Sequence, residues 1–195
     1  METIIKMYVT LMPAIIAGVL NMIWCKLPIL KFLNVPIDNK KKLKDGKRIF
    51  GDNKTWKGFI GYIILGCFAS IIWGLVCDKC GLNGYNYYYE ANSNTIWFNA
   101  VVGLLIGLFY ALFELPNSFL KRRLDITPGK TIKGKKKILF IILDQADSVF
   151  GVCLVVAMFH PMSFIFYIQY VLLGALTHLV INILLYILRL RKNMF

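Results

Sequence analysis

Two aspartates, Asp144 and Asp147, lie three residues apart inside an otherwise apolar run of the sequence. On a helix, positions i and i+3 share a face, so both carboxylates point the same way. Such a pair suits a hard divalent cation such as Mg²⁺, which takes one or two protein carboxylates and completes its coordination with water and phosphate oxygens. Two alternatives stay open: one aspartate pairs with a lysine or caps a broken helix, or the pair belongs to a cation-transport site.

Another acid, Glu114, stands two residues before Pro116 at the end of a different apolar run. Proline disfavours helical geometry at the residue before it, so we predict that the helix breaks at this point. Asn117 or Ser118 would then cap the start of a short cytoplasmic helix. Glu114 would lie close to that break, near membrane depth.

The predicted short helix carries a hydroxyl, an ammonium and a guanidinium on one face, from Ser118, Lys121 and Arg122. Behind a helix N-terminus, these three groups would form a cradle for phosphate oxygens. The alternative is that the bases are ordinary residues of a cytoplasmic loop, where Lys and Arg accumulate.

The segment 46–58 is a further polar constellation, placed just before an apolar run. Its three glycines allow close backbone approach to a ligand. Its side chains offer both cations and directional hydrogen bonds, whereas a loop that only sets topology would need the bases alone. We predict that this segment binds substrate, through Arg48, Asp52, Asn53, Lys54, Thr55 and Lys57.

Five apolar runs are long enough to position these groups in a membrane. Each has about the 20 residues that a helix needs to cross the hydrocarbon core, and they cover 4–25, 58–77, 96–116, 138–159 and 163–188. With 58% hydrophobic and 17% charged residues, the chain is not a typical soluble domain. We therefore predict an all-α integral membrane protein with five transmembrane helices, forming a single polytopic domain over residues 1–195.

The basic residues predict the orientation of these helices. Of the 23 Lys and Arg, ten lie in segment 26–57, eight in 118–137 and three in the C-terminal tail. Cytoplasmic loops collect Lys and Arg, so we expect the N-terminus outside and the C-terminus in the cytoplasm. The net charge of +13 indicates contact with anionic lipid or phosphate ligands rather than with nucleic acid.

Polar residues inside the predicted spans must face the bundle interior. An Asp at the centre of a membrane helix costs about 2.5–3.5 kcal/mol on insertion scales, so Asp144 and Asp147 require a polar cavity or a bundle core. His178 and Asn182 lie one turn apart in the last span and share a face. For these two, interhelical hydrogen bonding is favoured over catalysis.

Three blocks of this sequence resemble the CDP-archaeol synthase family, the short branch of the CTP:lipid-phosphate cytidylyltransferases, which is related to the CDP-diacylglycerol synthases. The blocks are Gly-Lys-Arg-Ile-Phe-Gly-Asp-Asn-Lys-Thr-Trp-Lys-Gly at 46–58, Pro-Asn-Ser-Phe-Leu-Lys-Arg-Arg at 116–123 and Leu-Asp-Gln-Ala-Asp-Ser-Val-Phe-Gly at 143–151. The second and third correspond to the signature of Ser-x-x-Lys-Arg followed by Asp-x-x-Asp. Together with the five spans, the blocks extend over essentially the whole chain.

The resemblance implies transfer of a cytidylyl group from CTP to a membrane lipid phosphate, giving CDP-lipid and pyrophosphate. It implies Mg²⁺ held by Asp144 and Asp147, with Glu114 as a further ligand, and phosphate contacts from Lys121 and Arg122. Substrate contacts would come from Asn117, Ser118 and the polar residues of block 46–58. The site would face the cytoplasm from the plasma membrane, the partners would be CTP and a lipid phosphate without nucleic acid, and a homodimer is left open.

Two other classes of function compete with this expectation. A cation-coupled transporter would use Asp144, Asp147 and His178 as an ion relay, but it would not need Ser-x-x-Lys-Arg or the glycine-bearing loop. A non-enzymatic membrane scaffold would tolerate neutral residues in place of the buried acids.

Overall fold

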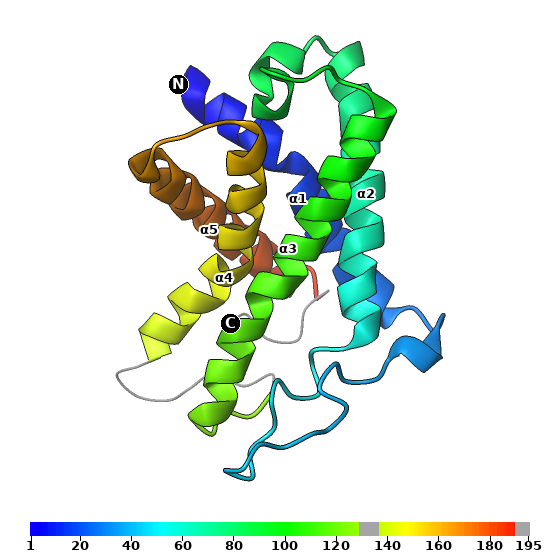
Figure 1. The fold of residues 1–195 in the computed structure, drawn as a ribbon, viewed down its shortest axis with the longest axis vertical. Helices are drawn as coiled ribbons and strands as arrows, with labels where there is room; N and C mark the ends of the chain where they lie inside the picture. Colours follow the sequence, from blue (N-terminus) through cyan, green and yellow to red (C-terminus); the bar gives the residue numbers. More distant parts are fainter. Residues whose placement is uncertain (129–136, 190–195) are drawn as a thin grey trace.

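The computed structural model describes residues 1–128 and 137–189 (Figure 1). The described part is helical, without extended strands, and five of its helices are long and apolar enough to cross a membrane, which confirms the predicted fold class. They are α1 (Glu2–Lys26), α2 (Trp56–Lys79), α3 (Ile96–Arg123), α4 (Lys137–Phe159) and α5 (Phe164–Ile187). Three short 3-10 helices lie in the connections: η1 (Lys31–Leu33), η2 (Asn83–Tyr85) and η3 (Tyr87–Tyr89).

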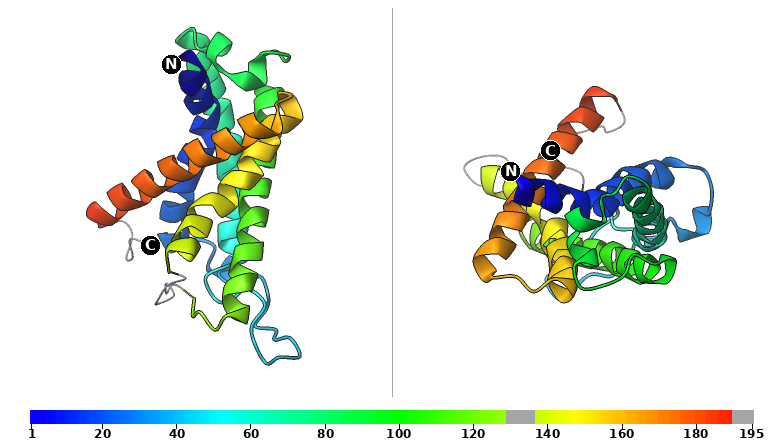
Figure 2. Two further views of the ribbon diagram at one scale, coloured as in Figure 1. Left: turned by 90° about the vertical axis from the view of Figure 1, so that its left-hand side faces the viewer. Right: turned by 90° about the horizontal axis from the view of Figure 1, so that it is seen from above.

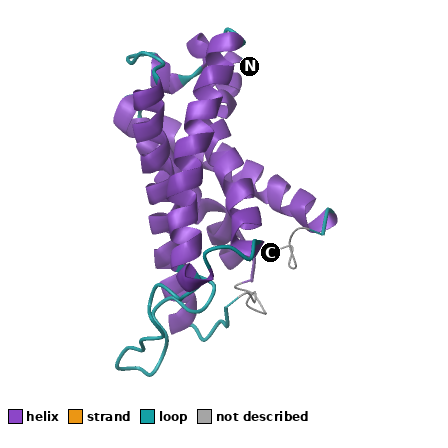
Figure 3. Cartoon of the chain, turned by 90° about the vertical axis from the view of Figure 1, so that its right-hand side faces the viewer, coloured by secondary structure: helices purple, strands orange, loops and turns teal. Residues whose placement is uncertain are grey.

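The connections gather at two opposite ends of the bundle (Figures 1 and 3). The basic end holds the loop 27–55 and the segment 124–128, where α1 and α3 end and α2 begins. The cap end holds the segment 80–95 and the turn 160–163. The described basic loops therefore share one end, as the charge pattern predicts. Several bases of that pattern, at 130, 133, 135, 136, 191 and 192, lie outside the described residues.

Glycines allow α3 to pack closely between α2 and α4. A methyl group added at Gly66 would lie 2.5 Å from the carbonyl oxygen of Gly103, and one added at Gly103 would lie 2.3 Å from that of Gly66. On the other side of α3, a methyl group at Gly151 of α4 would lie 2.4 Å from the carbonyl oxygen of Phe109. Small residues at membrane helix interfaces let backbones approach in this way. They make α2, α3 and α4 a compact unit.

The cap half of the bundle is filled by side chains. Tyr87 and Tyr88 fold in from the connection between α2 and α3 and are buried against α4 and α5. The backbone N–H of Tyr87 donates to Thr10 Oγ1 of α1 at 3.0 Å. Val155 and Tyr170 are fully buried in the same core. The bundle is therefore closed at this end.

The helix break predicted at Pro116 is wrong, because α3 continues through this proline to Arg123. Proline removes one backbone hydrogen bond from the helix interior. The turn that follows is instead tied to α4 through Asn117 and Lys121, whose side chains donate to Asp144. These contacts hold the last turns of α3 in helical form. The predicted N-cap and the anion-binding helix N-terminus behind Ser118 are therefore absent.

Helix α5 crosses the bundle obliquely (Figure 2). Near the cap end it is joined to α1, where Tyr170 Oη donates to the backbone oxygen of Met7 at 2.8 Å and Thr177 Oγ1 lies 3.3 Å from Tyr8 Oη. Toward the basic end, α5 leans away from the other helices (Figure 2). Residues of both α1 and α5 line a cavity in the half of the bundle that carries the basic loops.

Candidate active site

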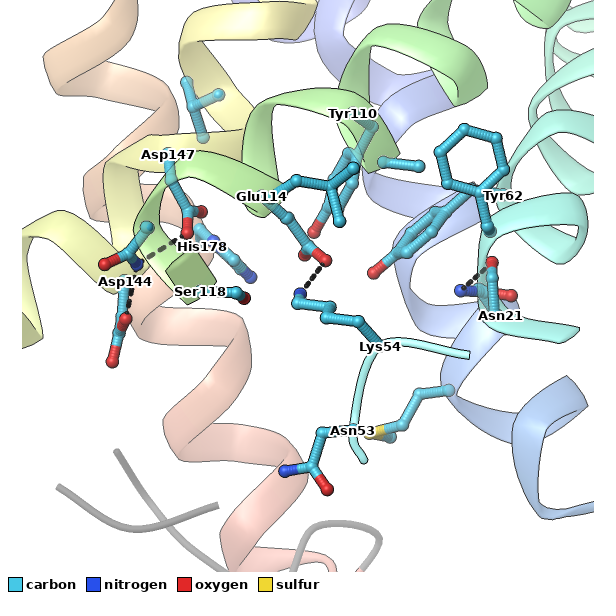
Figure 4. A pocket seen from close by; sticks show the side chains of 18 of the residues that line it. Asn21, Asn53, Lys54, Tyr62, Tyr110, Glu114, Ser118, Asp144, Asp147 and His178 are labelled. Atoms are coloured by element: carbon cyan, nitrogen blue, oxygen red, sulfur yellow. Dashed lines mark hydrogen bonds and ion pairs between the residues drawn. The ribbon is translucent and has the colours of Figure 1, made fainter. Parts of the chain in front are cut away.

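A cavity of about 720 Å³ opens within the basic half of the bundle and contains most of the predicted site residues (Figure 4). All five long helices and the loop before α2 contribute to its wall. The predicted residues that line it are Asn53, Lys54, Thr55, Glu114, Asn117, Ser118, Lys121, Arg122, Asp144 and Asp147.

The two aspartates of α4, Asp144 and Asp147, point toward α3 and contact it at the wall of this cavity. The side-chain nitrogen of Asn117 donates to Asp144 Oδ1 at 2.7 Å and to Asp147 Oδ2 at 2.8 Å. One nitrogen thus brings together an oxygen from each carboxylate. The prediction that both acids turn into the bundle interior is confirmed.

The two aspartates differ in how their charge is balanced. Lys121 donates to Asp144 Oδ2 at 2.6 Å, so the lysine pairing left open for one of the acids is present. Asp147 accepts from the backbone N–H of Ser148 at 2.6 Å, and within residues 1–128 and 137–189 no lysine or arginine forms a salt bridge with it. Among the described residues, Asp147 therefore accepts hydrogen bonds only from neutral donors, and its charge is balanced from a distance by Lys54.

The donor set around the aspartates fits Mg²⁺. The described residues contain no group of three His, Cys, Asp or Glu placed to hold a metal, so the acidic ligands at hand are Asp144 and Asp147. Asn117 adds an amide, and its Oδ1 is buried without a hydrogen-bond partner. Rotation of that amide would present Oδ1 where Nδ2 now meets both carboxylates. Two carboxylates and an amide oxygen are ligands that Mg²⁺ accepts, with water and phosphate completing its shell.

Glu114 is engaged by a lysine in this structure. The Lys54 ammonium forms an ion pair with Glu114 Oε2, reaching from the loop into the cavity (Figure 4). Burial alone would lower the pKa of Lys54, but the carboxylate of Glu114, reinforced by Asp147 and Asp144, raises it above its usual value. The charged form of Lys54 is therefore favoured by the acids around it, and a metal contact by Glu114 stays a prediction.

Three predicted substrate residues do not line the cavity. Arg48 Nη2 donates to Asp38 Oδ1 at 2.6 Å, and its Nη1 donates to Asp52 at 2.9 Å. Lys57 Nζ donates to the backbone oxygen of Leu27 at 2.6 Å. The structure places Arg48 and Asp52 in the frame of the loop, and Lys57 in the first turn of α2 against the end of α1, rather than beside the acids.

The frame is built around Asp38, which sequence reasoning missed. Its buried carboxylate also accepts the backbone N–H groups of Lys40, Phe50 and Gly51, at 3.1, 3.0 and 2.9 Å. Burial would raise the pKa of Asp38, but these bonds and the Arg48 guanidinium hold it well below its usual range. One signal could have found it: Asp38 is the only acid among the bases of segment 26–44.

Arg122 has hydrogen-bond donors for which the described part of the protein provides no acceptor. It is 8% exposed and lines the cavity, and its Nε and Nη1 are buried without a hydrogen-bond partner in the described chain. A methyl group at Gly51 would lie 3.1 Å from Arg122 Nη1, and Gly51 itself has φ of +99°. Glycine is thus favoured there by its backbone conformation and by the close approach of Pro128, whose Cγ would lie 2.9 Å from that methyl group, as well as of Arg122. Buried, unpaired guanidinium donors are suited to phosphate oxygens.

Aromatic and amide groups complete the inner wall. Tyr62 and Tyr110, which sequence reasoning also missed, stack with ring centroids 4.2 Å apart, and Figure 4 places both hydroxyls on the side of Glu114. On α5, Asn182 Nδ2 donates to Gln145 Oε1 at 2.7 Å, and His178 Nδ1 lies 3.2 Å from the backbone oxygen of Gln145. The predicted interhelical role of His178 and Asn182 is confirmed.

The relatives that this chain matches include CDP-archaeol synthases from three archaea. That of Archaeoglobus fulgidus is 28% identical, covering 89% of this chain and 96% of the relative. That of Methanospirillum hungatei is 30% identical, covering 81% and 88%. That of Pyrococcus furiosus is 34% identical over a shorter match, which spans 59% of this chain and about three fifths (61%) of that relative's length.

One solved structure shares the fold. It is described as an intramembrane enzyme for archaeal membrane lipids biosynthesis, and it superposes with a TM-score of 0.61 over 90% of this chain and 92% of that chain, at 24% sequence identity. The family model for CarS-like CDP-archaeol synthase matches residues 1–195. This chain, with its five membrane helices and its acid pair facing a basic, loop-covered cavity, belongs to the CDP-archaeol synthase family.

Proposed function

We propose that this protein transfers a cytidylyl group from CTP to a membrane lipid phosphate, giving CDP-lipid and pyrophosphate. The observation that carries the proposal is the joining of Asp144 and Asp147 to Asn117 and Lys121 inside one cavity. Carboxylates beside unpaired basic donors match a metal-bound nucleotide triphosphate. Relatives named CDP-archaeol synthase support the choice of CTP and lipid phosphate over other phosphate ligands.

The reaction needs positioning and charge stabilisation more than covalent help from the protein. An oxygen of the lipid phosphate attacks the α-phosphorus of CTP, and the bond from that phosphorus to the bridging oxygen of pyrophosphate breaks. Arg122 and Lys121 lie on successive positions of α3 and can bind the oxygens that gain charge as pyrophosphate leaves. Ser118 lines the same cavity and offers a hydroxyl donor.

A divalent cation completes this set of charges. When bound, Mg²⁺ would be held by Asp144, Asp147 and the amide of Asn117, and it would neutralise triphosphate charge. Lys121 now balances Asp144, and its ammonium would be available to bind phosphate if a cation were held by that carboxylate. Lys54 is released from Glu114 in the same way when an anionic substrate enters. The two ion pairs therefore balance the charges of Glu114 and Asp144 when no substrate is bound.

The membrane placement follows from the substrates. CTP is a cytoplasmic solute, so we propose that the basic end faces the cytoplasm of the plasma membrane and that the N-terminus lies outside. A lipid phosphate held at head-group depth then lies beside the loop that carries Asn53 and Lys54. A cation transporter would need a path through the cap half as well, where Tyr88, Val155 and Tyr170 fill the core.

Purified protein incubated with CTP, Mg²⁺ and a panel of lipid phosphates tests the proposal. Ester-linked and ether-linked lipids are both included, and the products are extracted and measured by mass spectrometry. We expect a CDP-lipid and an equal amount of pyrophosphate. Absence of CDP-lipid with every lipid phosphate would contradict the proposal. Cation uptake by proteoliposomes without CTP would instead support a transporter.

A further inference from the structure

Most glycines of the membrane helices are explained by close helix packing. A methyl group added to any of them would lie between 2.0 and 2.6 Å from a neighbouring atom, at Gly61, Gly66, Gly74, Gly103, Gly107, Gly151 and Gly174. Two are different: Gly58, in the first turn of α2, where the nearest atom would be 3.5 Å away, and Gly18, in the middle of α1. A methyl group at Gly18 would lie 3.6 Å from its nearest neighbour, Tyr110 Oη, which is ordinary van der Waals contact. Because glycine weakens a helix relative to alanine, its presence at this position calls for another reason.

Gly18 lines an apolar arm of the cavity. The arm runs between α1 and α5 and is bounded on a third side by α4. Its walls are mostly aliphatic, from Leu11, Ala14, Ile15, Val19 and Met22 of α1, Val149 and Val152 of α4, and Ile181 and Leu185 of α5. Thr177, His178 and Asn182 of α5 also line the cavity, but their side chains are hydrogen-bonded within the protein, to Leu173 and Gln145. The α1 residues recur at helical spacing, so they form one stripe. Gly18 lies within this stripe beside Tyr110, where the arm meets the polar site.

The arm lies at the depth of hydrocarbon. Gly18 is eight residues from Lys26, the last residue of α1, so it lies about 12 Å into the helix from the basic end at 1.5 Å per residue. Leu11, on the same scale, lies about 22 Å from that end, beyond the middle of a hydrocarbon core about 30 Å thick. There the arm closes, because Leu11 Cδ1 lies 3.6 Å from the Cβ position of Gly174.

The side of the arm between α1 and α5 is incompletely covered by protein. Ile15, Val19, Met22 and Ile181 are only half-buried although they line the cavity. Figure 2 shows α5 leaning away from the bundle at this level. In a membrane, the neighbouring molecules on that side are lipid chains. The aliphatic side chains give a nucleotide or a phosphate group no hydrogen bonds, and the polar groups of Thr177 and Asn182 already donate to protein oxygens, so the arm suits hydrocarbon rather than CTP.

We propose that the arm between α1 and α5 binds a hydrocarbon chain of the lipid phosphate, which enters sideways from the leaflet, and that Gly18 keeps the passage beside Tyr110 wide enough for it. This inference rests on the proposed function. The polar cavity then holds the phosphate while the arm holds the chain. Gly18 is a specificity-determining residue for the chain rather than for the nucleotide.

Replacement of Gly18 by leucine tests the passage. The new side chain starts without a backbone clash and extends into the arm. We expect the KM for a long-chain lipid phosphate to rise about 15-fold or more, the effect of displacing two buried methylene groups. The KM for a short-chain lipid phosphate with four-carbon chains should change less than about threefold, because its chains do not reach the arm. CTP binding by equilibrium dialysis should stay unchanged.

Leu20→Phe is the matched control, because Leu20 is 41% exposed on α1 and does not line the cavity. It should leave both KM values as in the wild type. If Gly18→Leu fails to fold, Ala14→Leu probes the same stripe one turn away. Equal KM shifts for long and short chains, or no shift for long ones, would overturn the inference. A wild-type protein that forms no CDP-lipid would instead overturn the proposed function, so the two failures are distinguishable.

Discussion

Neutralising the two aspartates one at a time should separate their structural and chemical roles. Asp144→Asn removes the partner of Lys121, whereas Asp147→Asn removes a charge that no lysine or arginine of the described chain pairs with. Both substitutions keep the side-chain volume. We expect both to abolish turnover, but to change the free energy of unfolding in opposite directions.

The magnitudes follow from the contacts. A buried charge costs several kcal/mol after relaxation, and an ion-assisted hydrogen bond such as that from Asn117 weakens by about 1 kcal/mol when its acceptor becomes neutral. Asp147→Asn should therefore stabilise the metal-free protein by about 1–3 kcal/mol. Asp144→Asn leaves the Lys121 ammonium facing a neutral amide. Because that pair is partly exposed, the expected loss is about 1–2 kcal/mol, below the 3–5 kcal/mol of a fully buried pair.

Turnover should respond differently from stability. Each variant loses one of the two anionic groups that would hold Mg²⁺ beside the triphosphate. Loss of one electrostatic group at a reacting centre costs about 10²–10³-fold in rate. CDP-lipid formation should therefore fall at least that far in both variants. Asp78→Asn, at an exposed acid near the cap end, is the matched control and should leave the rate and the stability as in the wild type.

Two measurements decide the outcome. Thermal or denaturant unfolding in detergent without divalent ions gives the stability of each variant, and extraction of CDP-lipid gives its rate. Activity within tenfold of wild type in either variant would refute the metal assignment. A loss of stability in Asp147→Asn as large as that in Asp144→Asn would refute the proposed difference in charge balance between the two aspartates.

Further outcomes follow from the loop, the helices and the metal. Asp38→Ala leaves Arg48 without its buried partner, so the loop that carries Lys54 should loosen and the KM for CTP should rise by about tenfold or more. A KM within twofold of the wild type would contradict this. The pKa of Asp38 is lowered in the folded protein, so the stability that its carboxylate contributes to the loop is fully present above pH 3.8, its usual pKa. That stability is lost only as the pH falls through the lower pKa of the folded state. The titration of Asp38 should therefore not raise the KM for CTP between pH 7 and pH 5. Gly103→Ala should destabilise the bundle by about 1–3 kcal/mol through overpacking against α2, measured by unfolding, and a neutral result would contradict the packing. Chelation with EDTA should stop CDP-lipid formation, and added Mg²⁺ should restore it; full activity after chelation would exclude a metal role.

The membrane helices and the inward orientation of the two aspartates were predictable from the sequence, because both depend on the large free-energy cost of placing polar groups in lipid. Uninterrupted apolar length identifies a span, and two carboxylates in such a span cannot face lipid. The predicted ends of the helices differ by a few residues, except for α3, which runs seven residues beyond its apolar stretch to Arg123. Pairing of Asn117 and Lys121 with Asp144, a contact distant in sequence, outweighs the local effect of Pro116.

What could not be predicted depends on contacts between segments far apart in the chain. Arg48 looked like a substrate cation because its partner, Asp38, is ten residues upstream and is reached only when the loop folds back. Tyr62 and Tyr110 were indistinguishable from other membrane aromatics until α2 and α3 brought their rings together. The unpaired donors of Arg122 are likewise a property of packing. Charge type was readable from the sequence, whereas the partner of each charge was not.

The position of the transferred phosphorus tests the central claim most directly. Purified protein is given Mg²⁺, a lipid phosphate and CTP labelled at either the α- or the γ-phosphorus, and the lipid fraction is counted. Cytidylyl transfer predicts label in the lipid from α-labelled CTP alone, and its loss in Asp147→Asn. Lipid labelled by the γ-phosphorus, or by neither, would contradict the account.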